Sequence, residues 1–284
     1  MQESNLTNAR VSTLTQIGII TKYNFLNYFR ARRFYVMMAI VLIISVLLTV
    51  LVGYYRPIEF VGGTALGFYG AGWGSFVTIV IILSTAFFGG DAISSEFQNR
   101  TGYFLVPNPI RRSAIYVGKW LAALAASTIV LGVFALIMIA NGLYYFPGSL
   151  PWGFVESLTF AWVYLIAALS LAFAFSSLFK SSSISILMSV ILLLFVFSVV
   201  DTVSEIVIGI EPWYSITYGA GIVTNALTDP FPQHITKTSP FGGGRFIFTT
   251  YNATIPEGLA ILGIYFVVMA LLGLWLFEHK EFTS

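Results

Sequence analysis

The stretch DAISSEFQNRTGYFLVPNPIRRSAIYVGK, residues 91–119, separates two strongly apolar parts of the chain. It is polar, basic and turn-prone, and charged residues stand at both of its ends. A charged side chain at the centre of a bilayer costs about 2.5–3.5 kcal/mol on insertion scales. The stretch therefore belongs outside hydrocarbon, and the apolar sequence on either side of it decides what kind of protein this is.

The composition is that of a membrane protein. Hydrophobic residues make up 57% of the 284, and charged residues only 9%, against about 25% charged residues in ordinary soluble domains. The mean hydropathy of +0.87 points the same way. The chain has no cysteine, which excludes disulfides, thiolate metal sites and a cysteine nucleophile. A net charge of +2 gives no reason to expect a nucleic-acid partner.

Six apolar segments predict an all-α membrane protein with one six-span transmembrane domain over residues 34–284. A helix of about 20 apolar residues crosses a hydrocarbon core of about 30 Å. The third segment is longer than one crossing requires, so we expect it to start below the membrane, to tilt, or to bend near Gly132. The predicted spans are residues 34–55, 73–90, 114–146, 154–178, 184–208 and 259–277.

Basic residues orient the chain, because loops rich in Lys and Arg stay in the cytoplasm. With the N-terminus inside, the outer segments hold only Arg56, Lys237 and Arg245 of the 14 basic residues. We therefore expect a multi-pass protein of the plasma membrane with both termini cytoplasmic. The long outer loop, residues 209–255, contains prolines and three consecutive glycines, and loops of that length are functional or contain short helices. Its Asn252-Ala-Thr is a glycosylation acceptor sequon, whereas a glycan on Asn99 would overturn the orientation.

Residues 1–33 predict an amphipathic, cytoplasmic connecting helix that lies in the membrane interface. A helical wheel places an aromatic face opposite a polar face, and we expect the aromatic face in the headgroup region. The alternative is a solvated leader. The aromatic side includes Leu14, Ile17, Thr21, Phe25, Tyr28 and Phe29, the polar side Gln16, Asn24, Asn27 and Arg30, and the helix is closed by Arg30, Arg32 and Arg33.

The predicted orientation puts residues 91–119 in the cytoplasm between the second and third spans. There Glu96 is followed five residues later by Thr101, then by Pro109-Ile110-Arg111-Arg112 and by Gly118-Lys119. This spacing resembles the permease subunits of ABC-2 type transporters, which carry an acid, Gly-Thr, Pro-Val-x-Arg and Gly-Lys. The sequence departs at Gly-Thr, because Arg100 precedes Thr101 and Gly102 follows it, which leaves the local helix geometry open.

The resemblance implies that residues 91–113 include a cytoplasmic coupling helix contacted by a separate ABC ATPase. Apolar side chains there would supply contact area, and charged ones would set the orientation of the partner. The alternative is an ordinary inner loop whose basic residues only enforce topology. The residues that the resemblance assigns to coupling are Asp91, Glu96, Phe97, Arg100, Thr101, Gly102, Tyr103, Pro109, Arg111, Arg112 and Lys119.

The chain itself has no P-loop. Gly118-Lys119-Trp120 lacks both the upstream glycine and the Ser or Thr of that motif, so no phosphate site is assigned here. We expect no catalytic residue, cofactor or metal in this chain, with ATP and Mg²⁺ bound by the partner. The resemblance implies two permease copies, identical or paired, with two ATPase subunits. The apolar spans favour export of a hydrophobic or amphipathic cargo, such as a drug or lipid.

Two other classes of protein are alternatives to the exporter. An intramembrane enzyme would need buried catalytic groups, but both histidines, His234 and His279, fall outside the spans. An ion-coupled secondary transporter is the main alternative. Asp201 and Glu205 share a helical face near the outer end of the fifth span, where they either bind a cation or lie in water at the interface.

Overall fold

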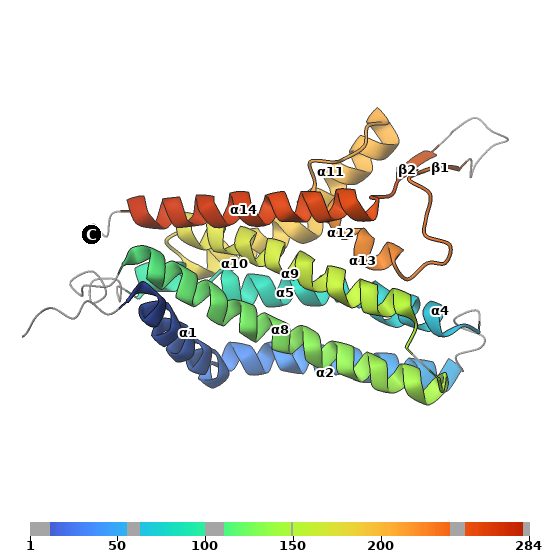
Figure 1. The fold of residues 1–284 in the computed structure, drawn as a ribbon, viewed down its shortest axis with the longest axis horizontal. Coiled ribbons are helices and arrows are strands. Elements are labelled where there is room, and N and C mark those ends of the chain that lie inside the picture. The colour runs from blue at the N-terminus through green and yellow to red at the C-terminus, as the bar shows by residue number, and fades with distance from the viewer. Residues whose placement is uncertain (1–11, 56–62, 100–110, 149, 239–247, 281–284) are drawn as a thin grey trace, which may run out of the picture.

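The computed structural model is a helical bundle elongated along one axis (Figure 1), and it describes residues 12–55, 63–99, 111–148, 150–238 and 248–280. The prediction of an all-α membrane protein with six spans is confirmed. Within the described residues, six helices are long and apolar enough to cross a membrane. They are Arg32–Tyr54, Ala65–Gln98, Arg112–Tyr145, Trp152–Leu178, Ser182–Ile208 and Ile255–His279.

A separate helix, α1 (Thr13–Arg30), precedes the first span. The chain then turns sharply into α2 (Arg32–Tyr55), which is the first span. Ser12 caps α1 by accepting a hydrogen bond from the amide of Thr15 at 3.2 Å. The second span is built from α4 (Ala65–Tyr69), the π-helical turn η1 (Gly70–Gly74) and α5 (Ser75–Gly89), and it leads into the short helix α6 (Ser94–Gln98). The third span is α8 (Arg112–Tyr145).

The last three spans are α9 (Trp152–Leu178), a composite helix and α14 (Ile255–His279). The composite fifth span joins α10 (Ser182–Ile191), η2 (Leu192–Val196), α11 (Phe197–Val203) and η3 (Ser204–Ile208). The loop after it contains helices α12 (Ile216–Ala220) and α13 (Ile222–Asn225). These precede an antiparallel hairpin of β1 (Ile235–Thr238) and β2 (Phe248–Tyr251), in which Ile235 pairs with Tyr251.

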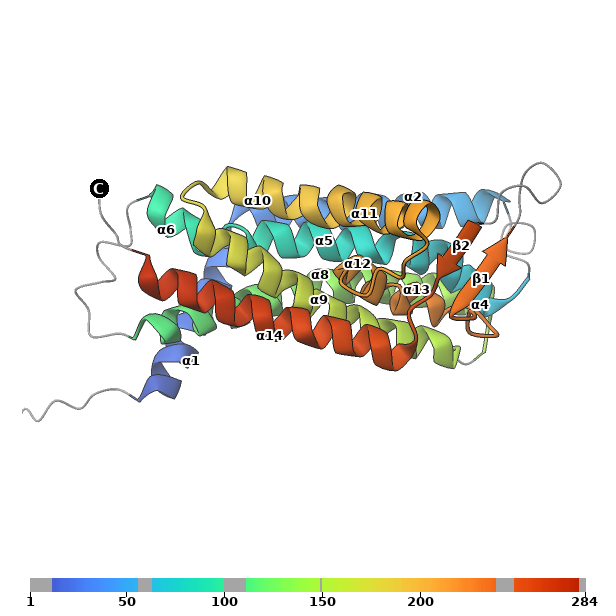
Figure 2. The same ribbon diagram turned by 90° about the horizontal axis from the view of Figure 1, so that it is seen from above.

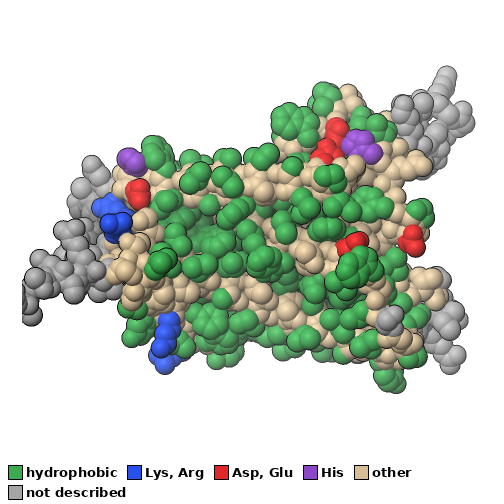
Figure 3. All heavy atoms as spheres, viewed as in Figure 1, with side chains coloured by type: hydrophobic (Ala, Val, Ile, Leu, Met, Phe, Trp, Pro, Cys, Tyr) green, Lys and Arg blue, Asp and Glu red, His purple; other side chains and the backbone are tan. Residues whose placement is uncertain are grey.

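The two ends of the bundle differ in what they carry. The start of α1, helix α6 and the end of α14 lie together at one end, which we call the termini end, and the β-hairpin lies at the other, the hairpin end (Figures 1 and 2). On the face shown in Figure 3, hydrophobic side chains cover the length of the bundle, and the Lys and Arg side chains gather at the termini end. This distribution suits a membrane around the middle of the bundle.

Helix α9 forms the centre of the bundle, packed against α14, α5 and α8. Its buried face is rich in small side chains, including Ala161, Ala168 and Ala172, which let neighbouring membrane helices approach closely. Towards the hairpin end, the Trp73 ring stacks on Phe134 with centroids 5.3 Å apart, and its indole N–H donates to Ser157 Oγ at 2.9 Å. The core is therefore formed by α5, α8 and α9, while α2, α14 and the fifth span remain largely exposed, as lipid-facing helices would.

The overlong third span is one continuous helix. Helix α8 begins at Arg112 and runs obliquely across the bundle in Figure 1 without a break at Gly132. A Cβ placed on Gly132 would meet no atom within 4 Å, so this glycine has no packing role in the single chain. The extra length lies mainly at the start of α8, where Arg112 to Lys119 join the termini end.

Candidate functional site

Helix α6 is attached to the bundle by hydrogen bonds at both of its ends. At its start, the amides of Ile93 and Ser94 both donate to Ser176 Oγ of α9 at 2.9 Å. At its end, Gln98 Oε1 accepts from the amide of Ser182, the first residue of α10, at 2.8 Å. A helix of five residues cannot hold its own conformation in isolation. These contacts therefore fix both its shape and its position.

A buried lysine from α8 holds the middle of this segment. Lys119 is only 6% exposed, and its ammonium group pairs with the carboxylate of Glu96 and donates to the carbonyl of Ala92 at 2.8 Å. A buried charge requires such partners, because an unpaired one costs several kcal/mol. The sequence singled out both residues, which are 23 positions apart, and the structure brings them together from α6 and α8.

A second ion pair ties the start of the segment to the turn between α1 and α2. Asp91 Oδ2 pairs with Arg33, while its Oδ1 is buried with no hydrogen-bond partner among the described residues. Beside it, Tyr28 of α1 donates to the carbonyl of Phe88 at 2.9 Å. Burial raises the pKa of Tyr28 and outweighs the opposing effect of Arg33, so the phenol stays protonated. Asp91, Arg33, Glu96 and Lys119 surround a polar cavity of about 370 Å³.

The end of α14 contacts the same segment through Lys280. Its ammonium group lies 4.2 Å from the ring centroid of Phe97 and donates to the carbonyls of Ser177, Leu178 and Phe179 at 2.8–3.1 Å. A cation at the C-terminus of a helix is favoured by the helix dipole. Burial, and then repulsion from Lys180, lowers the pKa of Lys280 to about 8. The sequence assigns no role to this lysine, which lies beyond the last predicted span, residues 259–277.

The remaining residues assigned to coupling are only partly described. Arg112 Nη1 donates to the carbonyl of Glu278 at 2.7 Å, and the amide of Arg111 donates to Gln16 Oε1 at 3.4 Å. Both contacts lie within the protein and join α8 to α14 and α1. Five further residues fall outside the part of the chain that the structure describes: Arg100, Thr101, Gly102, Tyr103 and Pro109.

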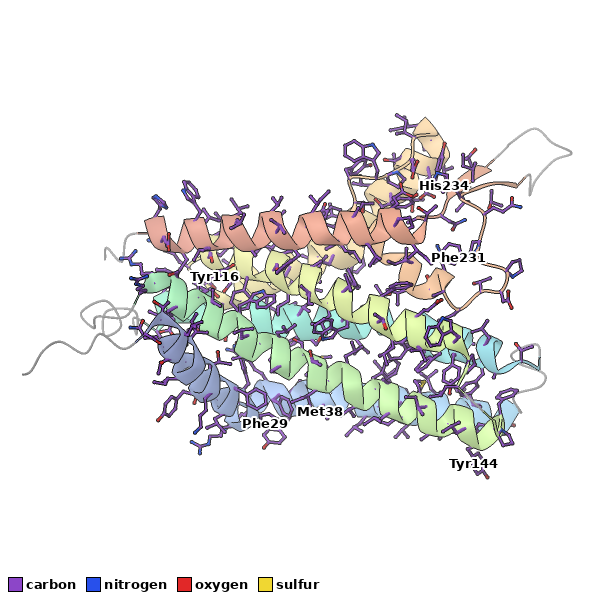
Figure 4. All side chains as sticks on the ribbon, in the orientation of Figure 1. Phe29, Met38, Tyr116, Tyr144, Phe231 and His234 are labelled. Atoms are coloured by element: carbon purple, nitrogen blue, oxygen red, sulfur yellow. The ribbon has the colours of Figure 1, made fainter. Side chains whose placement is uncertain are left out.

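Helix α1 packs against α8 through a glycine. A Cβ on Gly118 would lie 2.7 Å from Ile20 Cγ2, so only glycine lets the two helices approach this closely. Two residues expected in the headgroup region contact the bundle. Tyr28 donates a hydrogen bond to the carbonyl of Phe88. The ring of Phe29, labelled in Figure 4, packs on that of Phe34 with centroids 4.5 Å apart. The exposed apolar stripe of α1 lies elsewhere, at Ile19, Tyr23 and Leu26. Among the predicted interfacial residues, Phe25 is half-buried, and Arg30 and Arg32 lie at the turn into α2.

The family model described as ABC-2 family transporter protein matches residues 18–282, nearly the whole of the chain and all six membrane helices. The chain belongs to the ABC-2 family of transporter proteins. A comparison with curated proteins finds none that matches. Membership in the ABC-2 family makes this chain a membrane permease of an ABC exporter, in which ATP hydrolysis is done by a partner.

One acid of the fifth span in this ABC-2 permease, Asp201, has structural partners. Asp201 Oδ2 accepts hydrogen bonds from the hydroxyls of Ser215 and Thr217, at 2.8 and 2.5 Å, which join the span to the start of α12. Glu205 lies one turn further along the same helix. These contacts favour an anchor for the loop after the fifth span over a mobile cation site, so they give no support to an ion-coupled carrier.

The sequon of the predicted outer loop lies beside the hairpin. Asn252 Nδ2 donates to the carbonyl of Gln233 at 2.9 Å, and the backbone amide of Asn252 donates to the carbonyl of His234 at 2.8 Å. A glycan on Nδ2 would replace one of its two hydrogens, so the bond to Gln233 could persist only through the other. Whether Asn252 is modified stays a prediction.

Proposed function

We propose that this permease subunit receives mechanical work from a separate ABC ATPase through α6 and the residues that follow it. The observation that carries the proposal is the attachment of α6 to three membrane helices at once, through Lys119 of α8, Ser176 of α9 and Ser182 of α10. Because α6 is held rigidly, a displacement of α6 would also move α8, α9 and α10. A flexible loop would instead absorb the displacement.

The orientation follows from the same proposal. An ATPase works where ATP is, so the termini end would face the cytoplasm and the hairpin end would face outward. The clustering of Lys and Arg side chains at the termini end supports this direction. Exposed residues at the end of α6, namely Gln98 and Asn99, are then available to a cytoplasmic partner.

Two copies of the chain, or this chain with a paired permease, would form the translocation path between them. Six spans are few for a complete path, and family membership supports an assembly that includes ATPase subunits. A hydrophobic or amphipathic cargo is the class that apolar, aromatic-rich spans favour. Cargo would move when the ATPases close on ATP and displace α6, which is alternating access driven from outside the permease.

The experiment exploits the absence of cysteine from the chain. Asn99→Cys at the end of α6 places one thiol at the proposed contact, and Thr228→Cys places a matched, exposed thiol near the hairpin end. After treatment of native membranes with a cysteine crosslinker, the Asn99→Cys variant should capture a protein with nucleotide-dependent ATPase activity. The Thr228→Cys variant should capture none.

Transport measured in reconstituted vesicles completes the test. Export of a fluorescent amphipathic substrate should require ATP and the captured ATPase. If both cysteine variants gave the same crosslinks, or if transport persisted after ATP depletion and followed an ion gradient, the coupling proposal would be refuted and a secondary transporter favoured.

A further inference from the structure

Three potential metal ligands from distant parts of the chain meet at the hairpin end. Glu211 follows the fifth span, His234 precedes strand β1 and Glu257 lies in the first turn of α14. One ligand atom from each lies within 4.8 Å of those of the other two. His234 is marked in Figure 4, beside the start of α14. The sequence placed this histidine in the outer loop but did not connect it with the two glutamates.

Hydrogen bonds orient the imidazole of His234 as they do in metal sites. Its Nδ1 lies 3.0 Å from the carbonyl oxygen of Asn252, and a carbonyl can only accept, so Nδ1 carries the proton. In the neutral imidazole Nε2 then keeps its lone pair, and it lies 3.5 Å from Glu211 Oε2, while Nδ1 lies 3.9 Å from Glu257 Oε2. A metal-binding histidine typically donates its other N–H to a carbonyl in this way, which fixes the tautomer and the ring orientation.

The two carboxylates are also held in place by other groups. Tyr218 Oη donates to Glu211 Oε1 at 2.6 Å, and Glu257 Oε2 accepts from the amide of Thr254 at 3.2 Å within the capping box of α14. Each ligand is thus positioned before any ion arrives.

Charge also favours a cation at this point. The carboxyl groups of Glu211 and Glu257 lie within hydrogen-bonding reach of each other, and adjacent carboxylates repel when both are ionised. Among the described residues, neither forms an ion pair with a lysine or arginine, and His234 is their one basic neighbour. A divalent ion would neutralise both carboxylates.

We propose that Glu211, His234 and Glu257 bind a divalent transition-metal ion, with water completing the coordination. One imidazole nitrogen and two carboxylates suit zinc, and three protein ligands with an open position is a recognised zinc arrangement. Ligand atoms about 2.0–2.1 Å from a tetrahedral ion lie about 3.4 Å apart, which matches the 3.5 Å between His234 Nε2 and Glu211 Oε2. The side chains are 26–38% exposed, so an ion can enter from water.

The ion would fasten the end of the fifth span to the start of α14 and to the hairpin. Glu211 lies three residues after η3, and Glu257 is the third residue of α14. One ion would therefore set the spacing between two membrane helices at the hairpin end. The site is independent of the proposed ATPase coupling, which lies at the opposite end of the bundle.

Metal titration of the full chain in lipid nanodiscs tests the site. After removal of bound metal with a chelator, Zn²⁺ should bind with a stoichiometry of one per chain and raise the Tm, and Mg²⁺ at the same concentration should not compete. Hydrogen exchange of β1 and β2 should slow on binding. Co²⁺ in the unmodified protein should give a visible absorption spectrum with nitrogen and oxygen ligands, which Zn²⁺ should abolish.

Variants locate the ion. Glu257→Gln preserves the capping box, which accepts Gln as well as Glu, and it should weaken Zn²⁺ binding at least about tenfold, as even lost supporting contacts do in metal sites. Glu211→Gln and His234→Gln should do the same. His279→Gln, at the termini end, is the matched control and should leave the affinity unchanged. No saturable Zn²⁺ binding, affinity unaffected by all three variants, or equal binding of Mg²⁺ would each overturn the proposal.

Discussion

Replacing Lys119 by methionine tests whether the buried ion pair holds α6 in place. The change removes the cation and leaves the Glu96 carboxylate and the Ala92 carbonyl without their partner. Breaking a buried pair costs about 3–5 kcal/mol, and the Lys119 side chain is 7% exposed. Glu96 is 20% exposed, so water screens part of the loss. We expect a loss of about 2–4 kcal/mol in the free energy of unfolding.

The double variant Lys119→Met with Glu96→Gln separates pairing from packing. It removes both charges, so we expect it to be less destabilised than the sum of the single variants, with a coupling energy of about 1–3 kcal/mol. Unfolding in mixed micelles of rising sodium dodecyl sulfate content, followed by circular dichroism, measures each value. Lys22→Met, at an exposed position of α1, is the control and should change little.

Two results would refute this reasoning. Strictly additive effects would show that Lys119 and Glu96 do not interact, and a Lys119→Met variant as stable as the Lys22→Met control would show that the pair does not fix α6. We expect the partner ATPase assembled with the Lys119→Met variant to hydrolyse ATP without matching transport, because α6 would move without the membrane helices.

Three further predictions follow from other contacts. Gly118→Ala should cost about 1–3 kcal/mol by forcing α1 away from α8, whereas Gly132→Ala on the same helix should not destabilise the protein; equal effects in thermal unfolding would contradict the packing argument. Labelling of Lys280 by an amine-reactive reagent, read by mass spectrometry, should rise with a midpoint near pH 8. Because this folded-state pKa lies below the ordinary 10.5, the lysine should make folding more favourable as pH rises between the two values, and a midpoint near 10.5 would refute the burial. In intact cells, an impermeant thiol reagent should label Thr228→Cys but not Ser12→Cys, and the reverse pattern would invert the proposed orientation.

The six spans could be predicted because a membrane imposes long, apolar helices that are visible in the sequence. The partners of the charged residues could not be predicted. Asp91, Glu96 and Lys119 were singled out for coupling and Arg33 for the interfacial helix, but nothing in the sequence paired Asp91 with Arg33 or Lys119 with Glu96. Pairing between distant helices depends on tertiary packing, and no local pattern records it.

The face of α1 that meets the bundle shows the same limit. Apolar residues occur on several sides of this helix, and the wheel selected the aromatic side for the membrane interface. The structure turns Tyr28 inward and leaves Tyr23 and Leu26 exposed, because Gly118 provides a flat surface for Ile20. The decisive residue lies on α8, nearly 100 positions away.

The contact between Lys280 and Phe97 sets an order for assembly. Helix α6 is synthesised long before α14, yet the cation on its aromatic ring comes from the residue just after α14. A nascent chain that has not yet inserted its last span therefore presents an incomplete α6. We expect a partner that recognises α6 in contact with Lys280 not to bind permeases that lack this contact. Only chains with all six spans inserted would then assemble into the transporter.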